Sequence, residues 1–310
     1  LTTAKGTVVH AKSGRTLRYG ELARSAAERT LNPQPQLKAA KDYAFTGKPV
    51  PRIDIPGKVD GSTKYGIDFS LPNMRVATVM AAPVREGKLL SVDPAPAMAI
   101  KGVEKVVKLD DAVAVVAKGY WPALQGLRAL QPKFSDGGHG EVSTASIFAD
   151  QDKAIADAAK AFDAKGGKLI EATYRAPYLH HAMMEPFALT AQYKDGKLDV
   201  WGGLQDPLNS RWEAAKAGGL SQDDVTFHAM PVGGGFGRKL PGNNSVIGQA
   251  VKLAMQSPWP VKVIWPREEE VRQGTYRPAS TIALKAALGS DGKIAAWQGT
   301  CSQDAMMEAG

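Results

Sequence analysis

The chain has 310 residues, of which 44% are hydrophobic, and a formal net charge of +8. This length predicts two or three domains, and no apolar run reaches the roughly 18 to 20 residues of a membrane-spanning helix. The single cysteine, Cys301, excludes a disulfide framework and a cysteine-ligated iron–sulfur cluster held within these residues. The basic residues form no aromatic-rich run, so their charge favours an anionic cofactor or an acidic partner over nucleic acid.

Residues 1–57 predict a small strand-and-helix segment followed by a linker. Residues 6–10 are typical of a short strand. Residues 19–31 predict a helix, because their apolar side chains recur on one face at helical spacing. Two prolines, Pro33 and Pro35, end this helix. The residues that follow are rich in Pro and Lys and are typical of an extended arm.

Residues 58–140 predict a second module, in which strands and helices alternate. Three strands are expected, at residues 74–82, 103–109 and 112–117. The third is a continuous apolar run, which is typical of a buried strand. Two helices are expected between and after them, at residues 95–101 and 121–130. This alternation favours an α/β or α+β unit, and a glycine cluster at residues 136–140 closes it as a loop.

Residues 141–310 predict a third module with the same mixed character. Helices are expected at residues 154–162, 210–217 and 245–256. Strands are expected at residues 168–174, on both sides of the turn at 194–196, and at 225–231, 261–265, 280–288 and 293–301. The polar residues 267–278 are expected to form a connection, in which the acidic run Glu268–Glu270 begins a solvated helical turn.

The stretch Pro231–Leu240 has four glycines within five residues, with Phe236 among them. Glycine permits a positive φ and close approach to the backbone, and successive N–H groups in such a loop can bind an anion. The basic pair Arg238 and Lys239 follows and favours a nearby phosphate. A P-loop is excluded because Leu240 replaces its hydroxyl residue, and the spacing also differs from a dinucleotide-binding fingerprint. A plain glycine-rich turn is the alternative.

Three motifs occur in an order that resembles the molybdenum hydroxylase family, which includes xanthine dehydrogenase and aldehyde oxidase. They are His181–Pro186, Gln205–Pro207 and Gly233–Lys239. The stretches 58–69 and 113–130 resemble the α/β-hammerhead domain of that family. The opening Gly14–Leu22 and the Gly-Gly-Gly-Phe-Gly-Arg-Lys variant are similar to the large (beta) subunits of the isoquinoline 1-oxidoreductase type and to related aldehyde-oxidising subunits of bacteria. The resemblance covers nearly the whole chain.

This resemblance implies an α+β fold, with an α/β-hammerhead domain at residues 58–140 and the first part of a molybdopterin-binding α+β domain at residues 141–310. Gln205 matches a glutamine beside the apical oxygen of molybdenum. Phe236 and Gly237 match a pair whose backbone approaches the molybdenum ligands, and no side chain of this chain is implied as a metal ligand. The loop residues implied to bind the cofactor are Gly234, Gly235, Phe236, Gly237 and Arg238.

The implied cofactor is molybdopterin cytosine dinucleotide, and the implied reaction is hydroxylation of an aldehyde or N-heteroaromatic carbon. Arg277 lies where some relatives carry a substrate-orienting arginine, and an ordinary surface arginine is an equal alternative. Leu240 stands where xanthine-oxidising relatives have a substrate-binding glutamate, which argues against purines. Electrons are expected to pass to a small [2Fe–2S] partner subunit. The resemblance also implies a periplasmic location.

The family's catalytic glutamate lies much further along its large subunit than any residue matched here. We therefore expect this chain to be a fragment that is inactive alone and is completed by the remaining C-terminal part of the same large subunit. A different class of interpretation is an isolated, non-catalytic fragment or scaffold domain that binds no cofactor.

The pair His180 and His181 suggests a metal site, but only Glu185 is near enough in sequence to be a third ligand. The family resemblance favours structural support around the cofactor site instead. Glu185 is expected to be a buried, hydrogen-bonded carboxylate, and Met183 and Met184 are expected in the core. Cys301 has no evident base beside it, and the Gly-x-Ser-x-Gly elbow of a serine hydrolase is absent from the sequence.

Overall fold

The computed structural model describes residues 1–84, 86–243 and 245–304, so the last six residues of the predicted third module lie outside the described part. The chain divides into two compact units, Leu1–Pro56 and Gly57–Gly310. Within the described residues, no helix is long and apolar enough to cross a bilayer.

The first unit contains a three-stranded antiparallel sheet and one helix. The elements are β1 (Thr2–Ala4), β2 (Thr7–His10), β3 (Arg15–Arg18), α1 (Tyr19–Ala27) and the 3-10 turn η1 (Ala40–Asp42). The predicted strand at residues 6–10 is confirmed, whereas the helix ends at Ala27 and not near Leu31. No residue of α1 is buried, and a helix without tertiary packing is marginal beyond its capped turns.

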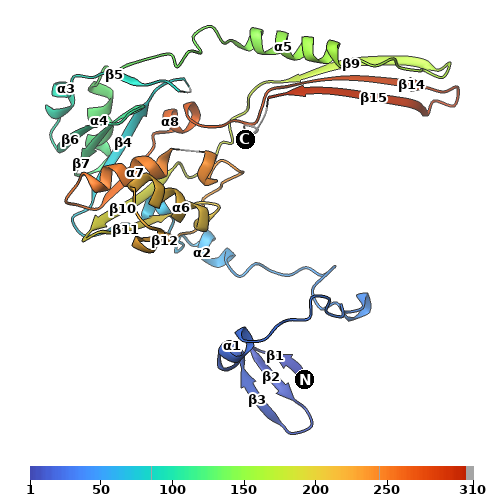
Figure 1. Cartoon of the computed structure of the whole chain (residues 1–310), viewed down its shortest axis with the longest axis horizontal. Helices are drawn as coiled ribbons and strands as arrows, with labels where there is room; N and C mark the ends of the chain where they lie inside the picture. The colour runs from blue at the N-terminus through green and yellow to red at the C-terminus, as the bar shows by residue number, and fades with distance from the viewer. Residues whose placement is uncertain (85, 244, 305–310) are drawn as a thin grey trace. The chain divides into compact units, whose positions relative to one another are not determined.

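The second unit is built on a seven-stranded mixed sheet (Figure 1). Its strands, in spatial order, are β12 (Val225–Ala229), β11 (Lys197–Gly202), β10 (Ala188–Lys194), β13 (Val261–Ile264), β4 (Arg75–Ala81), β7 (Ala112–Ala117) and β6 (Val103–Lys108). The β11–β12 and β13–β4 pairs are parallel and the other pairs are antiparallel. The β13–β4 pairing joins strands from the two predicted modules in one sheet, and the domain boundary after residue 140 stays a prediction.

Helices cover both faces of this sheet. One apolar core lies between the sheet and the pair α6 (Pro207–Gly218) and α7 (Val246–Met255), and another lies beneath α4 (Tyr120–Ala129) and the short α3 (Ala95–Met98). The side chains of strand β7 alternate between the two cores. Val113 and Val115 enter the second core, whereas Ala114 and Val116 enter the first. A strand that is buried on both faces has a continuous apolar sequence, so the prediction for residues 112–117 is confirmed.

A second, three-stranded antiparallel sheet is formed by β9 (Lys168–Ala176), β14 (Ser280–Leu288) and β15 (Ile294–Gln303), and helix α5 (Thr144–Asp157) packs on it. The predicted helix at residues 154–162 is therefore placed too late in the chain. Its true start is set by Ser143, whose hydroxyl caps the Ser146 N–H at 3.2 Å. Buried Gln151 then anchors the helix by donating to the Ala279 carbonyl at 3.0 Å.

The remaining elements are short. They are α2 (Ile55–Val59), the two-stranded pair β5 (Leu89–Ser91) and β8 (Lys133–Phe134), the 3-10 turns η2 (Gly66–Asp68), η3 (Gln222–Asp224) and η4 (Pro241–Asn243), and α8 (Arg267–Arg272). Helix α8 corrects the prediction of a solvated acidic turn, because Glu269 and Glu270 are only 3% and 0% exposed. Glu269 accepts the Ala81 N–H at 3.1 Å and so joins α8 to the edge of strand β4.

Candidate functional site

The glycine-rich loop connects β12 to α7 and has an unusual backbone. Gly234, Phe236 and Gly237 have φ values of +99°, +54° and +92°. A non-glycine residue in the left-handed region costs roughly 1–2 kcal/mol, and such strain persists where the surroundings hold it in place. The strained Phe236 also directs an aromatic side chain outward, 61% exposed. Backbone strain of this kind clusters at ligand-binding sites, so it favours a binding loop over a plain turn.

Gln205, which follows strand β11, is hydrogen-bonded into this loop. Its Oε1 accepts the Gly237 N–H at 2.9 Å and the Lys239 N–H at 3.2 Å, and its own backbone N–H donates to the Lys239 carbonyl at 3.1 Å. Backbone N–H groups can only donate, so the carboxamide oxygen faces the loop and the NH2 group faces away from it. A Cβ on Gly235 would lie 2.5 Å from Oε1, so this glycine is required by packing against Gln205.

Glu185 fixes the beginning of the loop at Gly233. Its Oε2 accepts the Gly233 N–H at 2.9 Å and the Lys239 ammonium at 2.7 Å, and its Oε1 accepts the Ile67 N–H at 3.3 Å. Glu185 and Lys239 are both buried, so the prediction of a buried, hydrogen-bonded carboxylate is confirmed. Burial lowers the pKa of Lys239, and the ion pair with Glu185 opposes that shift.

The Arg238 side chain also points into the interior and is 0% exposed. Its guanidinium lies 5.0 Å from the Phe187 ring centre and 5.8 Å from the Trp265 ring centre, within cation–π range, and donates to the Gln273 carbonyl. The expectation that the side chains of Arg238 and Lys239 face a phosphate is therefore wrong for this structure. Both cations stabilise the loop from inside, and its outward surface is formed by backbone and by Phe236.

The residues directly before Glu185 also lie against the loop, where Met183 and Met184 are close to Gly234. His180 is fixed there, because its Nδ1 accepts the Ala182 N–H at 3.0 Å and its Nε2 lies 2.9 Å from Glu270 Oε1. The Nδ1 acceptor assigns the ring proton to Nε2, which donates to Glu270. Arg267 completes the clamp by donating to Glu270 at 2.5 Å and to the Met183 carbonyl at 2.8 Å.

The contacts of His180 and Arg267 hold the segment so that His181 lies beside the loop at Gly237. His181 Nε2 would lie 4.0 Å from a Cβ on Gly237, whereas Nδ1 is buried with no hydrogen-bond partner among the residues that the structure describes. Burial lowers the pKa of His181, and Arg277, Arg238 and His180 lower it further against an opposing effect of Glu270. Burial and the neighbouring positive charges therefore favour the neutral ring.

Arg277 forms an isolated antiparallel β-bridge with Leu179, two residues before His181. Its N–H donates to the Leu179 carbonyl at 3.0 Å, and its carbonyl accepts the Leu179 N–H at 3.2 Å. Its positive charge is one of the causes that lower the pKa of His181. The side chain is exposed, which leaves it able to meet a ligand.

The other residues of the His181–Pro186 motif have structural positions. Met183 is buried as predicted, whereas Met184 is 88% exposed and the prediction of a core residue is wrong. The reason is that the Met184 carbonyl accepts from Arg267 at 3.0 Å, which fixes the backbone at the surface. In the described part of the chain, no group of three or more His, Cys, Asp or Glu residues is arranged to hold a metal ion.

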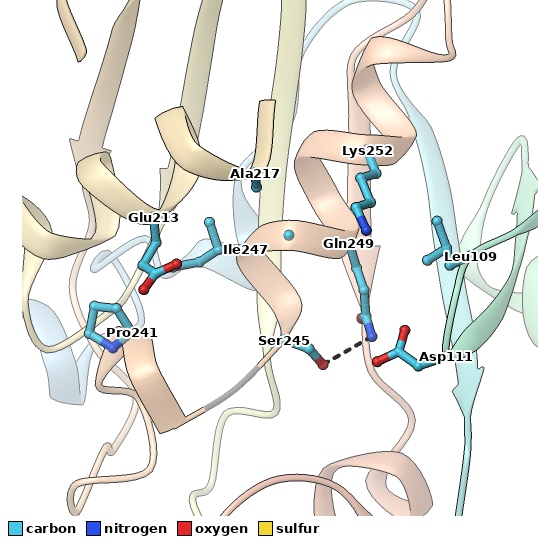
Figure 2. Close-up of a pocket in the computed structure, with 10 residues that line it drawn as sticks. Leu109, Asp111, Glu213, Ala217, Pro241, Ser245, Ile247, Gln249 and Lys252 are labelled. Atoms are coloured by element: carbon cyan, nitrogen blue, oxygen red, sulfur yellow. Dashed lines mark hydrogen bonds between the residues drawn. The ribbon is translucent and has the colours of Figure 1, made fainter. Parts of the chain in front are cut away.

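A pocket of about 190 Å³ lies elsewhere in the second unit, between α6, α7 and the turn joining β6 to β7 (Figure 2). Glu213, Asp111 and Lys252 give it charged walls, and Gln249 donates to Ser245 at 3.1 Å beside it. No residue from 233 to 240 lines it. The pocket is therefore separate from the loop site.

Comparison with known proteins defines the class of this site. Residues 139–307 match the family model of the molybdopterin cofactor-binding domain. The chain is 28% identical to the beta subunit of isoquinoline 1-oxidoreductase from Brevundimonas diminuta, over 99% of this chain and 46% of that protein. It is also 28% identical to a nicotinate dehydrogenase subunit from Pseudomonas putida, over 94% of this chain and 26% of that protein. The chain thus spans about half or less of the length of these two relatives.

Solved structures share the fold. Quinoline 2-oxidoreductase from Pseudomonas putida 86 superposes with a TM-score of 0.62 at 17% identity, over 82% of this chain and 39% of that one. CO dehydrogenase from Oligotropha carboxidovorans superposes with a TM-score of 0.61 at 18% identity, over 82% of this chain and 39% of that one. The mixed α+β fold is that of molybdenum hydroxylase large subunits. The chain belongs to the molybdopterin cofactor-binding domain family.

The structure brings most of the predicted site residues together. Gln205 accepts hydrogen bonds from the Gly237 and Lys239 N–H groups of the loop, and Arg277 pairs with Leu179, two residues before His181. The position of His181 could not have been found from spacing alone, because its neighbours come from the glycine loop and from the segment after α8. The motif His181–Pro186 was the available signal, and it indicated support and not a ligand contact.

Proposed function

We propose that this chain is the molybdopterin-binding part of an oxidoreductase that hydroxylates an aldehyde or an N-heteroaromatic carbon. The observation that carries the proposal is the convergence of Gln205 on the strained loop at Gly237, within a chain that belongs to the molybdopterin cofactor-binding domain family. The names of the relatives support an aldehyde or nitrogen heterocycle as substrate, since they include isoquinoline 1-oxidoreductase, nicotinate dehydrogenase and an aldehyde oxidoreductase of Escherichia coli.

The residues present fit such a cofactor. Among the residues that the structure describes, a Cβ on Gly237 would meet nothing closer than His181 Nε2 at 4.0 Å, so the missing side chain leaves room for a group to approach the backbone. Beside this opening, the Gln205 NH2 group faces away from the loop and is able to donate to an oxygen atom.

Each residue has a role in this proposal. Gln205 would donate to an oxygen of the molybdenum centre, Phe236 and Gly237 would present the backbone surface against it, and Gly234 and Gly235 would shape the loop. Arg238 would act from within, by holding the loop with its buried side chain, and Arg277 would orient the substrate. The cofactor, when bound, supplies the redox chemistry, and the protein supplies position and electrostatics.

The finer features are proposals of the same kind. We infer that the cofactor carries a cytosine dinucleotide, that a small [2Fe–2S] subunit accepts the electrons, and that the enzyme is periplasmic. Residues 58–140 would be its α/β-hammerhead domain and residues 141–310 the first part of its molybdopterin-binding domain. The catalytic base would come from a further part of the same large subunit. The similarity to relatives that are named as subunits supports this division of labour.

The test is to express the protein as its gene encodes it, in a host that makes molybdopterin, and to measure molybdenum and cytosine nucleotide per chain. We expect about one of each, together with dye-linked oxidation of benzaldehyde or isoquinoline. The 310-residue chain alone is expected to show no turnover, because no residue in it is matched to the family's catalytic glutamate. Protein that folds with neither molybdenum nor pterin would overturn the proposal in favour of a scaffold without cofactor.

A further inference from the structure

His181 is the residue beside the loop whose geometry the proposed function does not explain. Its neighbour His180 is fully engaged, with Ala182 and Glu270 as partners. His181 has one ring nitrogen buried without a hydrogen-bond partner in the described residues, and the other directed at the open side of Gly237. The chain thus uses one histidine to fix the segment and leaves the next one able to meet a ligand.

The proton of the neutral His181 ring belongs on Nε2. Orphaned buried N–H groups are rarer than under-satisfied acceptors, so Nδ1 is better left as a lone pair. The groups that influence the ring from all sides are Arg277, Arg238, His180 and Glu270. Nε2–H is then a donor that points across the opening at Gly237.

The side chains around this opening share one chemical property. Gln205, whose Oε1 accepts the Gly237 N–H, offers its NH2 group, and His181 offers Nε2–H, and both are donors. A ligand that satisfies them carries acceptor oxygens. We propose that His181 is a ligand-positioning residue, whose Nε2–H donates a hydrogen bond to an oxygen acceptor of the group bound against Gly237. This inference rests on the proposed function, and the oxygen can belong either to the cofactor or to the substrate.

The backbone is built to hold this donor in place. Ala182, directly after His181, has a φ of +51°, a conformation that a non-glycine residue adopts at a cost. The strain is held by the Ala182 N–H on His180 and by Arg267 on the Met183 and Met184 carbonyls. A strained segment with hydrogen bonds on both sides of one imidazole is typical of a pre-organised ligand contact.

The experiment compares three variants in the gene-encoded protein from a molybdopterin-producing host. His181→Phe keeps a ring but no nitrogen, and His181→Gln returns an N–H donor near the Nε2 position. The control His139→Phe makes the same change at a surface histidine, whose side chain is 44% exposed and 3.9 Å from Glu86. The measurements are melting temperature, molybdenum and pterin per chain, the rate of pterin loss on dialysis, and kcat and KM.

If the oxygen belongs to the cofactor, His181→Phe should lose pterin about 10-fold faster or more, which is the effect of one hydrogen bond to a charged acceptor. If it belongs to the substrate, cofactor content should be unchanged and kcat/KM should fall about 10- to 100-fold. In both cases His181→Gln should recover part of the loss, and His139→Phe should match the wild type. Should His181→Phe fail to fold, His181→Asn, which displaces the donor, takes its place.

Two results would overturn the inference alone. They are wild-type pterin retention and wild-type kcat/KM in the variant that lacks the donor, or equal impairment of His181→Gln and His181→Phe, which would indicate ring shape and not hydrogen bonding. A wild-type protein without molybdenum or pterin is a different failure. It would overturn the proposed function, and this inference with it.

Discussion

Gln205 and Gly237 are 32 positions apart in the sequence, and the Gly237 N–H donates to Gln205 Oε1 at 2.9 Å. Because the same oxygen also accepts the Lys239 N–H, the carboxamide is held with its oxygen toward the loop and its NH2 group outward. One side chain thus stabilises the loop with its acceptor and leaves its donors for a ligand. The two halves of the carboxamide can be separated by mutation.

Gln205→Glu should fold like the wild type and function poorly. A carboxylate oxygen accepts the same two backbone N–H groups, so we expect little change in melting temperature. The outward donors are lost and a negative charge replaces them, so kcat/KM should fall about 10- to 100-fold, as for a lost hydrogen bond to a charged group. Gln205→Ala, which also removes the acceptor, should in addition destabilise the fold by about 0.5–1.5 kcal/mol. Wild-type turnover by Gln205→Glu would contradict a ligand-facing role for the carboxamide.

Gly237→Ala separates a cofactor loop from a plain turn. Gly237 and Gly219 both have a positive φ and an open Cβ position, with φ values of +92° and +62°. Alanine at either site should cost roughly 1–2 kcal/mol, but only the change at Gly237 should lower molybdenum per chain and turnover, because a 1 Å displacement at a reacting centre can cost about 100-fold in rate. Metal analysis and thermal unfolding on the same preparations check this. Equal molybdenum and turnover in both variants would indicate that position 237 is only a turn.

Lys239→Met should be strongly destabilising. The change leaves the buried Glu185 carboxylate without its cation, and breaking a buried ion pair in this way costs about 3–5 kcal/mol. The double variant Glu185→Gln with Lys239→Met should recover part of that loss, because no buried charge remains. Urea unfolding of the single and double variants measures the coupling.

The matched control for this ion pair lies at the surface. Lys197 pairs with Asp224 at 2.6 Å, with side chains 63% and 37% exposed, and Lys197→Met should cost less than about 1 kcal/mol. If the two lysine variants lose similar stability, the Glu185–Lys239 pair is not the support of the loop.

His181 should make stability depend on pH in one direction. Its pKa is lowered below the ordinary value of 6.5, chiefly by burial and then by Arg277 and Arg238. The unfolded state therefore binds the proton more readily, so the contribution of neutral His181 is present above about pH 6.5 and is lost as the pH falls through the lower pKa of the folded state. The free energy of unfolding of the wild type minus that of His181→Phe, measured from pH 8 to pH 5, should decrease on acidification. A difference that is constant with pH would show that the His181 pKa is not lowered.

The sequence by itself determined the features that depend on local pattern. The apolar run at residues 112–117 required a strand buried on both faces, and the glycines at 234 and 237 allowed the positive φ values that the loop adopts. The motif order from His181 to Lys239 also indicated the family, and the comparisons confirm it. Periodicity and the conformational range of single residues are local properties, so they can be recognised without knowing the tertiary contacts.

Only the tertiary structure decided which charged side chains face a ligand. Arg238 and Lys239 look like anion-binding residues in the sequence, yet both are buried, and the partner of Lys239 is Glu185, 54 positions away. Glu270 was expected in water and instead fixes His180, 90 positions away. A charge can be buried when a distant segment supplies its counter-ion and hydrogen bonds. That compensation has no local signal, and it is the reason why His181 and Gln205, and not the basic pair, direct their donors toward the space above Gly237.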